Sequence, residues 1–497
     1  MSGSGGLQNY MSSLRLGGKM KSGSIVKTAT LLTQTGALLT GFLILAAFVL
    51  SILWDVEKAL LLGGAFGCLL VLLLPALLSR CYDVFQPLSF AILSVAIGVT
   101  GRTVYILFNP DGAVHLLLGK DPEFMLPAIL IMLIGSLFFV IGYMHRFPRM
   151  SLRRFKIVRS DVWDTRRLWI IVGVFTVIAI IAEALFLQRT GFQLEDITSI
   201  SRKRFILLPE SELGYTALGY LRWAASLSQI AFMLVMAWFI SSGKRWFSAA
   251  GLAVVTMFGI AASFPFLTSA RGALLWLILS SIIMWHYLRR PLSTRTVVVS
   301  AILSVAVLSV LINLRRGDVN VAEGISVEGV AERLFGSRDL LDITTTAHII
   351  TAIQEGRLDY SYGWTYLTWL YAPIPRIIWL EKPVVSVGWV VRGYVFGFGG
   401  MGGTPPGSVG EAFWAFGWFG VIIIMLALGG IEGSIYRSLG AYVHKNKNMA
   451  LVYAFLFLPW SFSALGGGWS NAVVGALEKA LPLMVALYFI TPRSKVG

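Results

Sequence analysis

Long apolar runs constrain the fold of this chain more than any other feature of its sequence. Runs of about 18 or more mostly apolar residues are typical of helices that cross a membrane, and they recur throughout the 497 residues. Only 13% of the residues are charged, whereas roughly a quarter are charged in an average soluble domain. The sequence therefore predicts an all-α fold, a polytopic membrane helix bundle.

Twelve runs are long enough to be predicted as spans, and the run at 272–288 is the shortest. The predicted spans cover residues 31–53, 57–79, 87–108, 124–145, 168–188, 218–241, 247–267, 272–288, 297–313, 411–434, 449–466 and 472–490. The chain then divides into a flexible tail over 1–30, nine spans over 31–313, a long loop over 314–410 and three last spans over 411–497.

The distribution of Lys and Arg predicts the orientation of these spans. With the N-terminus inside, the inner segments carry 23 of the 41 basic residues, and the run "RFPRMSLRRFKIVRSDVWDTRR" at 146–167 is the most basic of them. Positive charge marks cytoplasmic loops, so both termini are predicted to be cytoplasmic and the 314–410 segment to lie outside. The Gly/Ser-rich, basic tail has no convincing cleavage site, which favours a cytoplasmic tail over a signal peptide.

Basic residues on the predicted outer side need a reason. They include Arg189, the cluster "SRKRF" at 201–205, Arg271 in "TSARG" and eight residues within 314–410. Long loops cross the membrane largely regardless of charge, and arginine also pairs with lipid headgroups. For the set as a whole we favour the alternative that these residues bind an anionic substrate. The net charge of +16 is interpreted against the membrane, and no nucleic-acid partner is predicted.

Three ionisable residues fall inside predicted spans, all in the outer half of the membrane. They are Arg102, Glu183 and Arg222. Charged groups at such depth usually face the interior of a bundle and mark a functional site. The structural alternatives are that Arg222 reaches the interface along its own side chain and that Arg102 and Glu183 pair with each other.

The long outer segment has its own internal pattern. In "SRDLLDITTTAHIITAIQEG" the positions Leu340, Ile343, Ala347 and Ile350 form one stripe, which predicts an amphipathic helix ending at Gly356. The stretch 360–380 is long and apolar, but its prolines and arginine predict an interfacial or re-entrant element on the outer face. A glycine-rich loop follows, whose backbone N–H groups suit phosphate or sugar oxygens.

The order of these features resembles a known family. "PIPRIIWLEKP", then a Gly/Thr/Pro loop, then "GEAFWAFGWFGV" at the start of a span is similar to the Wzy-type oligosaccharide repeat unit polymerases. "SRKRF", the arginine of "TSARG" and "LINLRRGD" also resemble that family. The resemblance covers about residues 195–435.

The resemblance implies a membrane glycosyltransferase with a C-type, all-helical fold in the bacterial inner membrane. Its substrates would be oligosaccharides linked to undecaprenyl diphosphate, and the growing chain would move from its lipid onto a new unit on the outer face. O-antigen or exopolysaccharide chains would be the product. Membrane lipids and a chain-length regulator are the expected partners, and no cofactor is expected. Five scattered histidines and two cysteines form no metal-binding pattern.

Candidate site residues follow from the resemblance and from the charges. Glu411 is the first choice for the general base, with Asp318 and Glu381 as runners-up; alternatively it stabilises its helix as an N-terminal charge. Arg271 and Arg376 are the other catalytic candidates, as cations that stabilise the leaving diphosphate. The residues expected to bind diphosphate or sugar are Arg204, Arg315, Arg316, Lys382, Arg392, Arg222 and Trp379.

Two other functions remain open. An O-antigen ligase has the same general layout, but its usual signature places a glutamate eight positions after a histidine, and here Gly356 follows His348 at that spacing. A transporter of polysaccharide or lipid-linked sugar would have internal repeats and binding residues at the middle of the membrane. No convincing repeat is visible in the sequence.

Overall fold

The structure is a computed structural model. It describes residues 55–78, 82–108, 122–145, 147–148, 156–190, 219–268, 270–293, 341–374, 378–379, 381–397 and 403–492, with the single positions 41, 296, 299 and 335. Every element in this part of the chain is helical, which confirms the predicted all-α fold.

Nine helical segments in the described part are long and apolar enough to cross a membrane. They are α3 (Val56–Leu78), α4 with η1 and α5 (Pro87–Phe108), α6 (Leu126–Met144), α8 (Thr165–Arg189), α10 with α11 (Gly219–Ser241), α12 (Ala249–Leu267), α20 (Gly407–Val443), α21 with η8 and α22 (Lys447–Gly466) and α23 (Trp469–Ile490). The predicted span 272–288 corresponds to the apolar helix α13 (Arg271–Leu288), which is slightly shorter than these nine segments. The predicted spans 31–53 and 297–313 lie outside the described residues.

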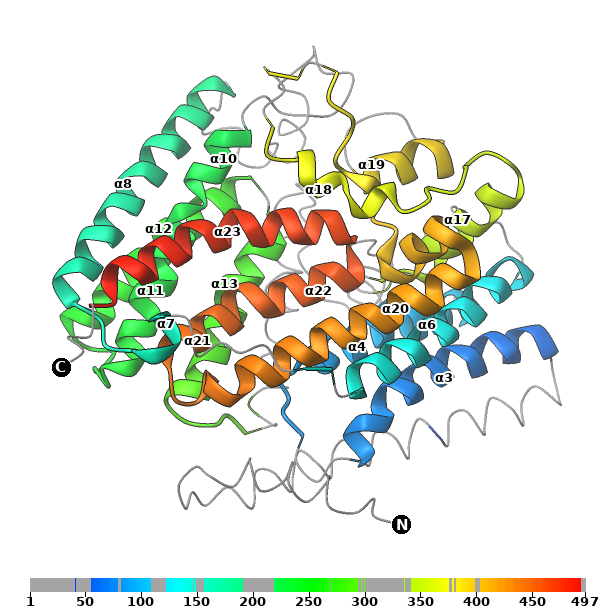
Figure 1. Ribbon diagram of the computed structural model, residues 1–497, viewed down its shortest axis with the longest axis horizontal. Coiled ribbons are helices and arrows are strands. Elements are labelled where there is room, and N and C mark those ends of the chain that lie inside the picture. Colours follow the sequence, from blue (N-terminus) through cyan, green and yellow to red (C-terminus); the bar gives the residue numbers. More distant parts are fainter. Residues whose placement is uncertain are drawn as a thin grey trace.

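The helices pack around two main cores. Figure 1 shows α3, α6 and α20 side by side, with α8, α10 and α12 at the other side of the molecule. The first core joins α8, α11, α13, α21 and α23, and Leu234 and Leu487 are fully buried in it. The second joins α3, α4, α6, α20 and α22, with Met132 and Val421 at its centre. Helix α22 contributes to both cores and connects them.

Glycines allow α6 and α20 to pack closely. A Cβ atom at Gly142 would overlap the carbonyl of Leu426, and one at Gly429 would overlap the carbonyl of Phe139. Small residues at a helix–helix contact let the two backbones approach, which is how helices commonly associate in membranes. Helix α20 is therefore held against α6 along much of its length.

Helix α20 is broken near its N-terminal end. Phe416 has φ/ψ of −146°/25° and Gly417 has 61°/−142°, so the backbone leaves the helical region for two residues. The positive φ at position 417 suits glycine, which has no Cβ to clash. Residues 407–415 are all buried. The predicted span 411–434 lies within α20, and the break divides this helix into a short buried helix before it and a long helix after it.

The predicted amphipathic helix is present as α17 (Ile343–Gln354), and Gly356 follows it with a φ of 70°. Ile343, Ala347 and Ile350 of the predicted stripe are buried; Leu340 lies outside the described residues. These side chains belong to the same core as α6 and α20. Residues 344–346, three threonines on the other sides of the helix, are also buried. Helix α17 is therefore part of the bundle and not a helix on its surface.

The close contact between η1 (Ala96–Gly101) and the chain before α17 depends on one glycine. A Cβ atom at Gly98 would overlap the carbonyl of Leu341. We expect Gly98→Ala to reduce stability by about 1–3 kcal/mol, the usual cost of overpacking, although alanine is the better helix former. Gly63→Ala is the control, because nothing lies within 4 Å of a Cβ there. Thermal unfolding in detergent checks this, and an equal melting temperature for both variants would contradict it.

Candidate functional site

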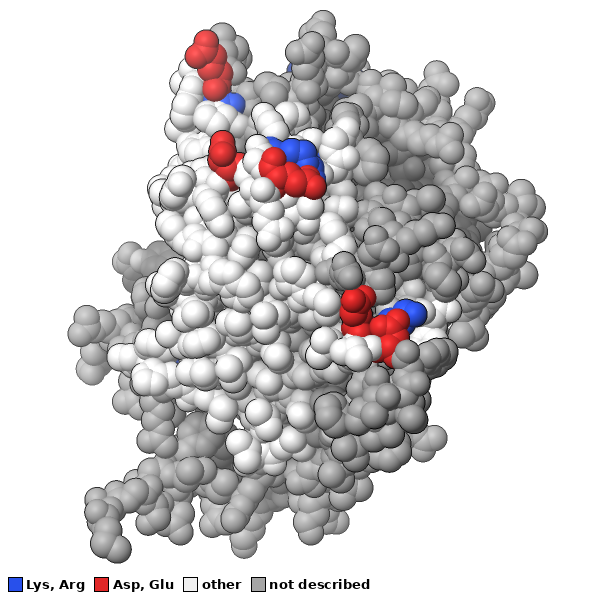
Figure 2. Space-filling model, turned by 90° about the vertical axis from the view of Figure 1, so that its right-hand side faces the viewer, with Lys and Arg blue, Asp and Glu red and all other residues white. Residues whose placement is uncertain are grey.

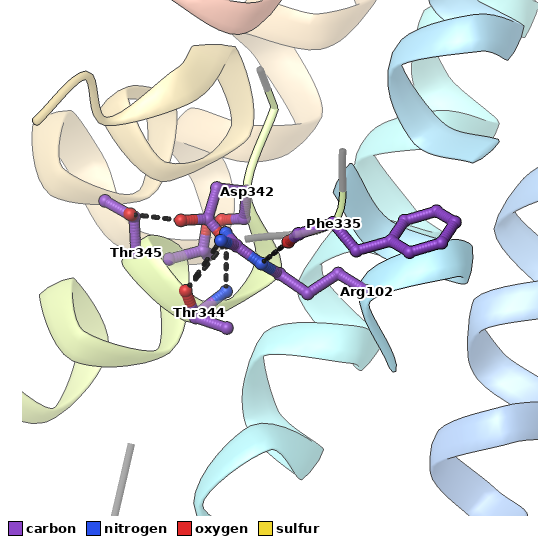
Figure 3. Close-up of polar contacts among 6 residues, drawn as sticks. Arg102, Phe335, Asp342, Thr344 and Thr345 are labelled. Atoms are coloured by element: carbon purple, nitrogen blue, oxygen red, sulfur yellow. Dashed lines mark hydrogen bonds and ion pairs between the residues drawn. The ribbon is translucent and has the colours of Figure 1, made fainter. Parts of the chain in front are cut away.

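Arg102 and Asp342 form a buried ion pair between the bundle and the start of α17 (Figure 3). Their side chains are 2% and 1% exposed. The Arg102 Nε atom donates to the carbonyl of Phe335 at 2.7 Å, and Nη1 lies 3.4 Å from the Thr344 hydroxyl. The guanidinium therefore joins α5 (Arg102–Phe108) to two points of the 314–410 segment. The suggested pairing of Arg102 with Glu183 is wrong.

Asp342 has further partners, which explain why α17 begins where it does. Its Oδ1 accepts from the backbone N–H of Thr344 at 2.9 Å and from the Thr344 hydroxyl at 2.7 Å. Its Oδ2 accepts from the Thr345 hydroxyl at 2.7 Å. This is the N-cap arrangement that satisfies free N–H groups at a helix start. Burial alone would raise the pKa of Asp342, but Arg102 and these hydrogen bonds hold it below its ordinary value. Arg102 and Asp342 thus both stabilise the fold: Arg102 binds the Phe335 carbonyl, and Asp342 caps α17.

The other two predicted intramembrane charges have separate neighbours. Glu183 Oε2 accepts from the Ser263 hydroxyl at 2.8 Å, between α8 and α12. Arg222 on α10 (Gly219–Ala225) is exposed and interacts electrostatically with Glu478 of α23. The neighbouring Trp223 donates its Nε1–H to the Glu478 carbonyl at 3.0 Å. The charges predicted to share one depth therefore do not converge on one site.

Glu411 lies in the short buried helix before the break in α20, and it is 0% exposed. Its Oε2 accepts from the backbone N–H of Trp469 at 2.9 Å. Trp469 is the first residue of α23, whose N-cap position is Gly468 and has no side chain to cap the helix. Glu411 therefore caps α23 from another helix, and the positive end of the helix dipole stabilises a carboxylate there.

A glycine makes this contact accessible. Gly468 has a φ of 144°, and a Cβ atom there would lie 3.3 Å from Glu411 Oε2. Such a φ is rarely adopted by residues with a side chain. Glycine at this position lets the Trp469 N–H point at the carboxylate without strain or crowding.

The second oxygen of Glu411, Oε1, is the one that could take part in chemistry. Oε1 has no hydrogen-bond partner among the described residues, and neither have the buried hydroxyls of Thr365 and Tyr366 on η6 (Trp364–Tyr366). Thr365 lies beside the carboxylate, and Tyr366 interacts with it electrostatically. Burial, and then the charge of Glu411, raise the pKa of Tyr366 well above its ordinary value, so its hydroxyl stays protonated. The Glu411 carboxylate is therefore a hydrogen-bond acceptor that lies beside two hydroxyl donors, those of Thr365 and Tyr366.

The stretch "YAPIPRIIWLEKP" is held together by Lys382. Its Nζ donates to the carbonyls of Ala372 and Ile374 at 2.7 and 2.8 Å, and the residue is 6% exposed. Trp379 is 38% exposed, and its ring packs edge-on against Tyr371 at 5.8 Å. These contacts show that the lysine closes a turn and leaves the tryptophan at the surface.

The remaining predicted residues are only partly described. Arg392 is half-buried in η7 (Val391–Val395), and its Nε has no hydrogen-bond partner among the described residues. Arg271 begins α13, but its side chain is not described, and Glu381 is exposed. The predicted residues Arg204, Arg315, Arg316, Arg376 and Asp318 lie outside the described residues.

The surface of the predicted outer end is mostly uncharged where it is described. Figure 2 looks onto the side where α17 and one end of α3 and α6 lie, and its described part is largely white. The basic side chains visible there lie next to acidic ones. Among the described residues, Lys58 forms a surface ion pair with Asp55, and Arg357 forms one with Glu355. The described part of this face therefore shows no basic patch.

Sequence reasoning missed Glu432, a second fully buried carboxylate on α20. Neither of its oxygens has a hydrogen-bond partner among the described residues. The signal that could have found it is a lone acidic residue within a predicted span, the same signal that drew attention to Glu183. Over the described part of the chain, no group of three or more His, Cys, Asp or Glu side chains could hold a metal ion.

Comparison with models of known families, with curated proteins and with solved structures finds no match. The class of protein therefore rests on the fold itself. Nine long apolar helices within the described residues, packed on one another, define a multi-pass α-helical membrane protein.

Proposed function

We propose that this chain is a polysaccharide polymerase that joins oligosaccharide units linked to undecaprenyl diphosphate on the outer face of a bacterial inner membrane. The proposal includes twelve spans, cytoplasmic termini and the C-type glycosyltransferase fold that the sequence resemblance implies. One observation supports it most strongly: Glu411 is buried in the short helix at the start of α20, with one oxygen held by Trp469 and the other without a partner among the described residues.

Such a carboxylate suits a general base. In the proposed reaction Oε1 takes the proton from a hydroxyl of the acceptor sugar as that oxygen attacks the anomeric carbon of the growing chain. The bond from this carbon to the diphosphate oxygen breaks, and undecaprenyl diphosphate leaves with the electron pair. Fixed cations stabilise charge that develops in a transition state. The proposed cations are Arg271, Arg376, Arg204, Arg315, Arg316, Arg392, Arg222 and Lys382.

The products of the purified protein test this function. Given undecaprenyl-diphosphate repeat units in detergent, the full chain should make a ladder of products that differ by one repeat unit, without nucleotide. Transfer of one finished chain onto a different acceptor would indicate a ligase instead. A known polymerase that is active in the same assay is the positive control. If this chain then forms no new glycosidic bond, the proposal is contradicted.

A transporter of lipid-linked sugar is the second candidate. The observation that favours it is Glu432, because a buried carboxylate within the membrane is typical of transport and proton pathways. Movement of lipid-linked sugar across vesicle membranes without bond formation would support this function over polymerisation.

A further inference from the structure

Glu432 occupies an environment in which a bare negative charge is costly. It lies fifteen residues after Gly417, at the break in α20, which places it about 22 Å further along the helix axis. The residue is 0% exposed. The Ser461 hydroxyl of α22 (Leu458–Gly466), which interacts with it, is buried and has no hydrogen-bond partner among the described residues. An isolated buried carboxylate needs a ligand that removes or balances its charge.

Neighbouring charged groups do not provide that balance within the described structure. Arg437 is just over one turn away on α20, but its Nη1 and Nη2 atoms donate to the carbonyls of Tyr143 and His145 at 2.8 and 2.9 Å. Tyr453, on η8, interacts electrostatically with Glu432, and its hydroxyl donates to the Phe85 carbonyl at 2.6 Å. In the part of the chain that the structure describes, the groups that interact with Glu432 are thus the hydroxyls of Ser461 and Tyr453.

Polar groups lie between Glu432 and one end of the bundle. Tyr436 is four residues after Glu432, so the two share a face of the helix. Its hydroxyl donates to Asp83 Oδ2 at 3.2 Å, and the Tyr287 hydroxyl donates to the same oxygen at 2.7 Å. His286 interacts electrostatically with Asp83. Asp83 is half-buried in the connection between α3 and α4.

A second histidine, His444, lies near these groups. The His444 ring packs edge-on against Tyr287 at 4.9 Å, and His444 interacts electrostatically with His286. The positive-inside distribution predicts this end to be cytoplasmic.

We propose that Glu432 and Ser461 form a proton-binding site inside the membrane, loaded from the side on which Asp83 lies. The protonated carboxyl group has an O–H that can donate to the Ser461 oxygen, so one proton removes the charge and provides a donor for the serine. One carboxylate and one hydroxyl offer too few oxygens for Ca²⁺ or Mg²⁺, which take six or more ligands. Loss of the proton places a charge between α20 and α22, which couples their packing to pH on that side.

Dicyclohexylcarbodiimide tests the site in the full chain, because this apolar reagent reacts with protonated carboxyl groups in membranes. The acid proton moves to a carbodiimide nitrogen, the carboxylate oxygen bonds to the central carbon, and the acyl group then shifts to nitrogen as a stable N-acylurea. Mass spectrometry should find the adduct at Glu432, and Glu432→Gln should lose it. The Glu183 adduct serves as an internal control in the same digest.

Sealed vesicles that contain the protein in one or the other orientation test the route. Raising the pH on the Asp83 side should reduce labelling of Glu432, whereas raising it on the other side should not. Asp83→Asn should slow this response. Labelling that follows the pH of the opposite side would overturn the proposed route.

The stability of Glu432→Gln provides an independent check. If the native group is a neutral acid, a neutral amide of the same shape should leave the melting temperature unchanged or higher. If Glu432 is ionised and balanced by a cation, the variant should melt lower and wild-type Glu432 should remain unlabelled while Glu183 reacts. That combination would overturn the proton site. Neither outcome depends on whether the protein polymerises sugar.

Discussion

Glu411→Gln should reduce kcat for polymer formation by about 10²–10⁴-fold, the usual contribution of general base catalysis. Glutamine keeps the shape of the side chain and an oxygen that can accept from the Trp469 N–H, so the cap of α23 is retained. It loses the ability to accept a proton. KM for the lipid-linked substrate should therefore change little, which separates lost chemistry from lost binding.

The matched control is Glu355→Gln, which makes the same chemical change on an exposed residue just after α17. Its kcat should equal that of the native protein. Full activity of Glu411→Gln would show that Glu411 serves only as the cap of α23, which glutamine retains. The steady-state rates of both variants, measured at equal amounts of folded protein, decide between the two roles.

Arg102→Ala should reduce the free energy of unfolding by about 3–5 kcal/mol, because it leaves Asp342 as a buried and unbalanced charge. Thermal unfolding in detergent measures this loss. Lys58→Ala is the control, since Lys58 pairs with Asp55 at 3.0 Å on the surface and its side chain is 52% exposed. An exposed pair contributes about 0–1 kcal/mol. Equal losses in the two variants would contradict the structural role of the buried pair.

The same pair predicts a dependence on pH. The pKa of Asp342 is lower in the folded chain than its ordinary value of 3.8. A group of this kind contributes stability that is present above its unfolded pKa and is lost as the pH falls through its folded pKa. The difference in stability between native protein and Asp342→Asn should therefore shrink at acid pH. A difference that grows with acidity would contradict this sign.

The sequence predicted the helices well, because membrane spans depend on local composition. Each predicted span within the described part is a helix, and the apolar stripe of α17 is buried as its spacing indicates. Composition could not predict that α17 also buries three threonines, because that depends on Asp342 and on the close approach at Gly98.

The partners of buried side chains and the breaks in helices were harder to predict, because they depend on tertiary packing and not on local composition. The depth of Arg102 was predicted from its helix, but Asp342 lies 240 residues later in the chain, and only the folded structure brings them together. The break in α20 lies at an ordinary Phe-Gly pair, Phe416 and Gly417, which gives no distinct signal within an apolar run. Glu411 was chosen from a resemblance, whereas its cap of α23 and its free oxygen depend on tertiary packing.

The most direct test of the central claim is the amount of undecaprenyl diphosphate released for each glycosidic bond formed by the purified protein. The proposed chemistry predicts one lipid diphosphate for every bond, because each transfer of the growing chain leaves its own carrier behind. Release should need neither nucleotide nor an ion gradient. In Glu411→Gln the release of undecaprenyl diphosphate and the formation of polymer should fall together. Lipid-linked sugar that crosses the membrane with no diphosphate released and no bond formed would contradict the account.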